Sequence, residues 1–164
     1  MSAVDDLLRN NQDYAMRFDR AGLPASPSLR LAVVACMDAR LDVNSVLGLE
    51  PGEAHVIRNA GGVVTEDVVR SLLISQRLLG TREIALVQHT GCGMLSLRDD
   101  DLTAQIEEDT GLRPPFALEG FDDLVLNVRQ SIATILGNPF IPHTDHVRGF
   151  VYDVETGRLE EVGP

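Results

Sequence analysis

Apolar and polar positions along the chain form two alternating kinds of segment. Short segments at residues 29–36, 53–59 and 83–89 predict buried strands: the first and third are mainly apolar, and the second has Val56 and Ile57 at its centre. After the second run, apolar residues recur at helical spacing behind Thr65, a good N-cap, and the pattern stops at Gly80. Strands and helices therefore alternate in this part of the chain.

The pattern continues on either side of this region. Residues 42–49 predict a short helix, and the acidic segment that ends near Thr110 predicts another. Residues 122–136 predict a helix with one apolar stripe, expected to bury Leu124, Val128, Ile132 and Ile135. The last two alternating runs, around Glu155, Thr156 and Gly157, predict a hairpin. We expect an α/β fold with a mostly parallel central sheet, about four parallel strands plus a C-terminal antiparallel strand, flanked by helices.

Residues 1–22 predict a separate N-terminal helical arm. Apolar side chains recur there at roughly helical spacing, with polar residues between them: Val4, Leu7, Leu8, Ala15 and Phe18. Residues 23–30 contain two prolines and two serines and predict a connector. Residues 31–164 form the α/β body, and a chain of 164 residues is expected to be one domain. The apolar face of the arm needs a surface to cover, on its own body or on a neighbour.

Composition narrows the function classes. The chain is 44% hydrophobic and 24% charged with two cysteines, as expected of a globular protein that depends on packing and not on disulfides. Its formal net charge of −11 at pH 7 disfavours nucleic acid and anionic membranes as partners. Because no signal peptide, transit peptide or apolar run of bilayer length is recognisable, we expect a cytoplasmic protein. In a reducing cytosol both thiols are available for a metal or for catalysis.

Three metal-binding side chains stand at or just after the ends of two predicted strands. Cys36 ends the first strand, His89 ends the third, and Cys92 follows in a glycine-containing turn. Functional groups of parallel sheets gather beyond the carboxyl ends of strands. Two thiolates and an imidazole suit Zn²⁺ and leave a fourth position open for catalysis. A lone buried cysteine or hydrogen-bonded histidine is commonly structural, so spacing alone leaves the zinc site and the structural interpretation both open.

Two other motifs are weaker. His143 and His146 could bind a metal with Asp145 if they were helical, but solvated loop residues are the better interpretation. The glycine-containing RNAGG segment at 58–62 lacks the Lys-Ser/Thr of a phosphate-binding loop, so tight backbone packing near the metal is favoured over nucleotide binding.

Three segments carry a family resemblance: CMDAR at 36–40, HVIRNAGG at 55–62 and HTGCG at 89–93. Together they resemble the β-class carbonic anhydrases, whose hallmarks are Cys-x-Asp-x-Arg followed later by His-x-x-Cys. The resemblance implies one zinc ion per subunit on Cys36, His89 and Cys92, with water or hydroxide as the fourth ligand. It also implies that Arg40 holds Asp38, and that Asp38 accepts a hydrogen bond from the zinc-bound water.

The implied reaction is the reversible hydration of CO₂ to bicarbonate and a proton by attack of zinc-bound hydroxide. The resemblance further implies a homodimer, or a dimer of dimers, in which the arm crosses to the partner. Some family members have a closed state in which the aspartate becomes the fourth zinc ligand. We expect Asp38 to do this at low pH, where the competing ligand is neutral water and not hydroxide.

Two alternative functions remain open. The same zinc site could hydrolyse COS or CS₂, which are also linear electrophiles. Cys36 and Cys92 could instead hold structural zinc in a thiol redox sensor. The sequence favours an enzyme, since a sensor has no need of the Asp38 and Arg40 pair.

Overall fold

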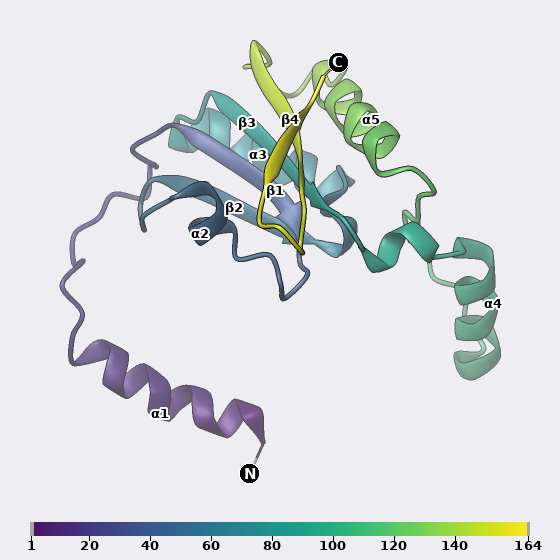
Figure 1. Ribbon diagram of the computed structural model, residues 1–164, viewed down its shortest axis with the longest axis horizontal. Helices are drawn as coiled ribbons and strands as arrows, with labels where there is room; N and C mark the ends of the chain where they lie inside the picture. Colours follow the sequence, from purple (N-terminus) through teal and green to yellow (C-terminus); the bar gives the residue numbers. More distant parts are fainter. Residues whose placement is uncertain (1, 164) are drawn as a thin grey trace.

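A five-stranded sheet forms the centre of the computed structural model, which describes residues 2–163. Met1 and Pro164, the outermost residues of the predicted arm and body, lie outside the described part. The strands are Leu31–Cys36 (β1), Ala54–Asn59 (β2), Glu83–His89 (β3), His146–Tyr152 (β4) and Leu159–Val162 (β5). Their order is β2-β1-β3-β4-β5, parallel except for the antiparallel β4–β5 hairpin (Figure 1). The predicted sheet type is therefore confirmed.

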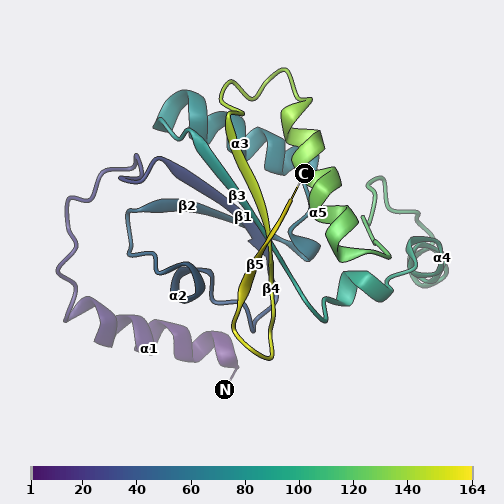
Figure 2. The same ribbon diagram turned by 45° about the horizontal axis from the view of Figure 1, so that its top comes forward.

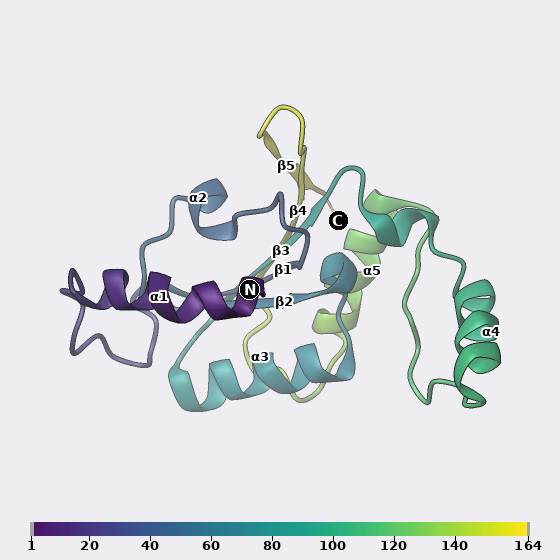
Figure 3. The ribbon, with the colours of Figure 1, turned by 90° about the horizontal axis from the view of Figure 1, so that it is seen from below.

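The helices are Ala3–Ala15 (α1), Val43–Leu47 (α2), Glu66–Leu79 (α3), Asp99–Thr110 (α4) and Leu124–Leu136 (α5), with 3₁₀ turns at Ala60–Gly62 (η1) and Gly93–Ser96 (η2). Helices α3 and α5 pack on one face of the sheet, and α2 lies on the other (Figure 3). Each face has its own apolar core, and Cys36 and Cys92 belong to the core on the α2 side. No helix within residues 2–163 has both the length and the apolar character needed to cross a membrane.

Helix α3 has the predicted ends for the predicted reasons. The Thr65 hydroxyl accepts a hydrogen bond from the Val68 N–H, and Gly80 ends the helix in the left-handed conformation with φ 76°. Strand β1 and helix α2 are shorter than predicted. Strand β1 begins after Arg30, whose φ of 54° breaks the extended backbone, and α2 ends at the left-handed Gly48.

One core residue of α5 differs from prediction. Val128, Ile132 and Ile135 are buried against the sheet as expected, but Leu124 is only half-buried. Leu124 stands at the first turn of the helix and packs with the core on the opposite face. The helical stripe is therefore divided between two cores at its N-terminal end.

Helix α1 lies apart from the sheet (Figure 2). It is helical as predicted, and none of its described residues is buried. Val4 is 72% exposed and Leu8 69%, and Leu7, Tyr14 and Phe18 are also exposed. The arm thus presents an apolar stripe that its own chain does not cover.

Candidate metal centre

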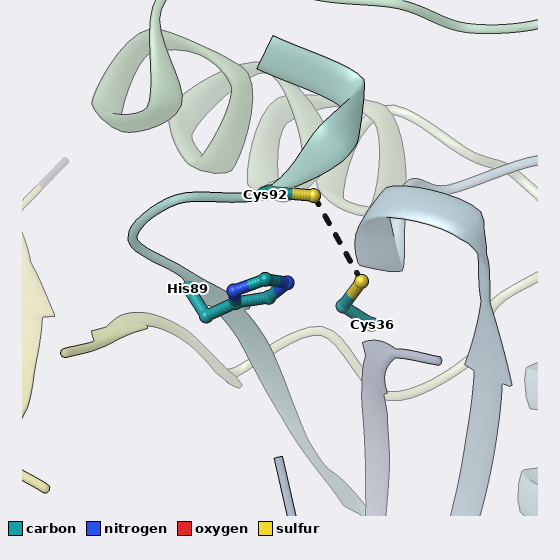
Figure 4. A group of neighbouring side chains, drawn as sticks. All are labelled: Cys36, His89 and Cys92. Atoms are coloured by element: carbon teal, nitrogen blue, oxygen red, sulfur yellow. Dashed lines mark hydrogen bonds between the residues drawn. The ribbon is translucent and has the colours of Figure 1, made fainter. Parts of the chain in front are cut away.

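The fold brings the three predicted metal ligands together. Cys36 ends β1 and His89 ends β3, and these strands are neighbours in the sheet. Cys92 follows in the turn after β3 and points back toward both (Figure 4). The ligand atoms all lie within 4.8 Å of one another, and the two Sγ atoms are 3.9 Å apart. All three residues are buried.

Two tight turns make this convergence possible. Gly91 has a φ of 62°, which allows the chain to reverse between His89 and Cys92. Across the site, Gly62 of η1 packs directly on the end of β1, and a Cβ there would lie 2.8 Å from the Cys36 amide nitrogen. The tight backbone packing expected of the RNAGG segment is therefore present.

The His89 ring is prepared to bind a metal through Nε2. Its Nδ1 lies 2.9 Å from the Thr90 carbonyl oxygen and, as an N–H, donates to it, which leaves the lone pair on Nε2. Within the described part of the chain, Nε2 is buried and has no hydrogen-bond partner. Buried polar nitrogens are rarely left unpaired, so a cation beside the two sulfurs accounts for this arrangement. Two sulfurs and one imidazole nitrogen are a donor set that fits Zn²⁺.

The ionisation of the cysteines also suits a cation. Burial raises the pKa of the Cys36 thiol, but the adjacent His89 ring and the Asp38 and Gly61 amides favour the thiolate and lower the pKa to about 7. Burial raises the pKa of Cys92, and the neighbouring Cys36 adds to the rise. The adjacent Cys36 sulfur raises the pKa of His89. Cys36 can therefore ionise to a thiolate near neutral pH without a metal.

Asp38 and Arg40 form an ion pair at the edge of the cluster. Arg40 Nε and Nη2 donate to the two carboxylate oxygens of Asp38 over 2.9 Å and 2.7 Å, and the Arg40 amide also donates to the carboxylate. These hydrogen bonds hold the pKa of Asp38 well below its usual range. Arg40 Nη2 also donates to the Gly91 carbonyl over 3.0 Å, which connects the two ligand-bearing loops. Asp38 thus faces Arg40 while its Oδ2 lies 3.6 Å from His89 Nε2.

The other histidines are not part of the site. His143 is tied through its backbone to the Gln76 side chain, and His146 is exposed at the start of β4. His55 contacts the Ser75 hydroxyl and the Ala25 carbonyl. Within residues 2–163, the cluster of Cys36, His89 and Cys92 is the one set of candidate metal ligands that lies close enough together.

Sequence reasoning missed a role for Arg58. Its side chain donates to the backbone carbonyls of Cys36 and Asp38, immediately beside the cluster. The RNAGG segment drew attention to this region for its glycines, and no pattern in the sequence identifies the acceptors of an arginine as main-chain oxygens.

Comparisons with known proteins agree with this geometry. The family described as "Carbonic anhydrase" matches residues 31–114. Over 164 residues, all of both chains, the protein is 57% identical to beta-carbonic anhydrase 1 of Mycobacterium tuberculosis. A carbon disulfide hydrolase of Acidianus is 32% identical over 96% of this chain and 88% of its own. The crystal structure of carbonic anhydrase from Streptococcus mutans superposes with a TM-score of 0.93, 42% identity and 99% coverage of both chains. The chain belongs to the β-carbonic anhydrase family.

Proposed function

We propose that this protein catalyses the zinc-dependent, reversible hydration of CO₂ to bicarbonate and a proton. The observation that carries the proposal is the buried Cys36, His89 and Cys92 cluster with the Asp38–Arg40 pair at its edge. A zinc ion on these ligands would supply a Lewis acid that lowers the pKa of water to about 7. Family membership and the 57% identical relative support CO₂ as the substrate.

Asp38 would orient a water molecule in this reaction. The hydrogen bonds from Arg40 keep the pKa of Asp38 low, so the carboxylate stays ionised and can only accept a hydrogen bond at neutral pH. Arg40 fixes the direction of that acceptor through its two-pronged contact and through the Gly91 carbonyl. We assign Asp38 the role of hydrogen-bond acceptor for the water molecule and Arg40 the role of holding Asp38.

Asp38 is also the candidate for a closed state in which it binds the metal as a fourth ligand. Its Oδ2 lies 3.6 Å from His89 Nε2, so among the residues at the cluster Asp38 would be the one to join Cys36, His89 and Cys92 in holding zinc. Because the carboxylate remains anionic at mildly acidic pH, Asp38 could still bind the metal there, where the competing ligand is neutral water and not hydroxide. Hydration activity that stayed constant from alkaline to mildly acidic pH would contradict closure.

A second candidate substrate is CS₂ or COS, because carbon disulfide hydrolases are among the relatives. CO₂ is favoured, because identity to the carbonic anhydrase is higher and covers both chains completely. Parallel rate measurements on CO₂, COS and CS₂ separate the two activities. A zinc and thiol redox sensor is disfavoured, because the Asp38–Arg40 pair contributes nothing to storing or releasing zinc.

The uncovered stripe of α1 supports a homodimer, or a dimer of dimers, in which the arm packs on the partner. The location that we propose for the enzyme is the cytoplasm. Neither statement affects the chemistry assigned to the cluster.

The test is stopped-flow CO₂ hydration with zinc analysis of the wild type, Asp38→Ala and the control Asp67→Ala. Asp67 is an exposed carboxylate on α3 that forms a surface ion pair with Arg70. We expect one zinc per chain in all three proteins and a loss of hydration of about 100-fold or more only in Asp38→Ala. Wild type that holds stoichiometric zinc and hydrates no CO₂ at any pH would favour the sensor.

A further inference from the structure

Arg58 on β2 reaches across to the backbone that carries the first metal ligand. Its Nε donates to the Cys36 carbonyl over 2.9 Å, and its Nη2 donates to the Asp38 carbonyl over 2.8 Å. The two acceptors stand on either side of Met37. One side chain therefore spans the segment between the candidate ligand Cys36 and the carboxylate Asp38.

Beyond Cys36 this segment no longer pairs with the neighbouring strands of the sheet. The pairing of β1 with β3 ends at Ala35 opposite Val87, and the pairing of β1 with β2 ends at Cys36 opposite Asn59. The Met37 amide donates to the Asn59 carbonyl over 2.8 Å, and beyond it the chain turns away. The Cys36 carbonyl accepts from the Arg58 guanidinium, and the Asp38 carbonyl accepts from Arg58 and from the Leu41 amide. Hydrogen bonds from a charged donor are stronger than those between neutral groups.

The two arginines of the site hold different parts of Asp38. Arg40 binds its carboxylate, and Arg58 binds its carbonyl. Arg40 also joins this loop to the Gly91 carbonyl, while Arg58 joins it to β2. The planar guanidinium is suited to this task, because its N–H groups point in fixed directions and can serve two acceptors at once.

We propose that Arg58 is a positioning residue that fixes the Cys36–Asp38 backbone so that thiolate and carboxylate face the same metal position. The inference rests on the proposed zinc function, and it assigns Arg58 no contact with substrate. Removing a group that orients a metal ligand typically weakens metal affinity by about 10–100-fold. Lysine at this position keeps the charge but has a single donor centre, so it cannot reproduce both contacts.

The experiment measures zinc affinity by competition with a chromophoric chelator in the wild type, Arg58→Gln, Arg58→Lys and the control Arg70→Gln. Arg70 is an exposed arginine on α3 with one surface partner, Asp67. We expect Arg58→Gln to bind zinc about 10–100-fold more weakly, Arg58→Lys to fall between it and the wild type, and Arg70→Gln to match the wild type. In CO₂ hydration of the zinc-saturated proteins, we expect kcat to fall and KM to stay unchanged for Arg58→Gln.

Thermal unfolding of the zinc-free proteins separates positioning from general stability. We expect both zinc-free Arg58 variants to unfold cooperatively, with midpoints lowered but still above the temperature of the zinc assay. Wild-type zinc affinity and kcat in Arg58→Gln would overturn the proposal, and so would a zinc-free protein that no longer folds in both Arg58 variants. If the wild type itself bound no zinc, the proposed function would fail and this inference with it.

Discussion

Gly62→Ala is the substitution whose effect on the metal centre follows most directly from the coordinates. Gly62 has a φ of 63°, and its missing Cβ would lie 2.8 Å from Cys36 N, 3.0 Å from Ala35 C and 3.2 Å from Val87 O. All three neighbours are backbone atoms of β1 and β3, so no side chain can rotate away. The methyl group must push apart the two strands that carry Cys36 and His89.

The magnitude has two parts. A left-handed φ costs a residue with a Cβ about 1 kcal/mol, and forcing a methyl group into packed backbone costs about 1–3 kcal/mol more. Gly80→Ala is the matched control, because Gly80 also has a positive φ, 76°, but a Cβ there meets nothing within 4 Å. The difference between the two variants isolates the steric part.

The assay is thermal unfolding of the zinc-free proteins at equal concentration, followed by zinc competition. We expect the midpoint to fall by about 4–16 °C for Gly62→Ala and about 2–4 °C for Gly80→Ala. Zinc affinity should fall at least about 10-fold only in Gly62→Ala, because only this change displaces Cys36. Equal effects of the two substitutions on stability and on zinc affinity would refute the idea that η1 shapes the metal site.

Three further predictions concern the pair, the thiols and the arm. Arg40→Lys keeps the charge but loses the fork to Asp38 and the bond to Gly91, so kcat for CO₂ hydration should fall about 10–100-fold in stopped-flow assays, and an unchanged kcat would contradict this role. In zinc-free protein, iodoacetamide should modify Cys36 with a half-maximal rate at about pH 7, because the thiolate is the reactive form, whereas Cys92 should require more alkaline pH because its pKa is raised. Mass spectrometry of the alkylated peptides measures the modification of each cysteine, and a lower pKa for Cys92 than for Cys36 would contradict this prediction. Deletion of residues 1–22 should convert a dimer into monomers in light scattering, and a dimer that persisted would show that α1 is not the main contact.

The elements with strong local signals could be predicted from the sequence. Strand β3 spans the predicted residues 83–89, and α3 lies between its predicted capping residues Thr65 and Gly80. The convergence of Cys36, His89 and Cys92 was also predictable, because residues at the carboxyl ends of neighbouring parallel strands meet.

The remaining features depend on tertiary contacts that no local pattern carries. The left-handed Arg30 shortens β1, although arginine gives no local sign of that conformation. Leu124 fits the helical stripe, but in the folded chain it packs with the other core, and the stripe alone does not distinguish the two cores. In the sequence Arg58 is an ordinary strand residue, and its contacts with the Cys36 and Asp38 carbonyls exist only in the folded chain.

The central claim is that the cluster holds one zinc ion and that this ion is required for CO₂ hydration. The most direct measurement removes metal with a chelator and follows the stopped-flow hydration rate as zinc is added back. We predict negligible hydration by the metal-free protein and a linear recovery that stops at one zinc per chain, with no recovery in Cys92→Ser at the same zinc concentrations. Hydration by the metal-free protein, or full zinc occupancy without hydration, would contradict the account.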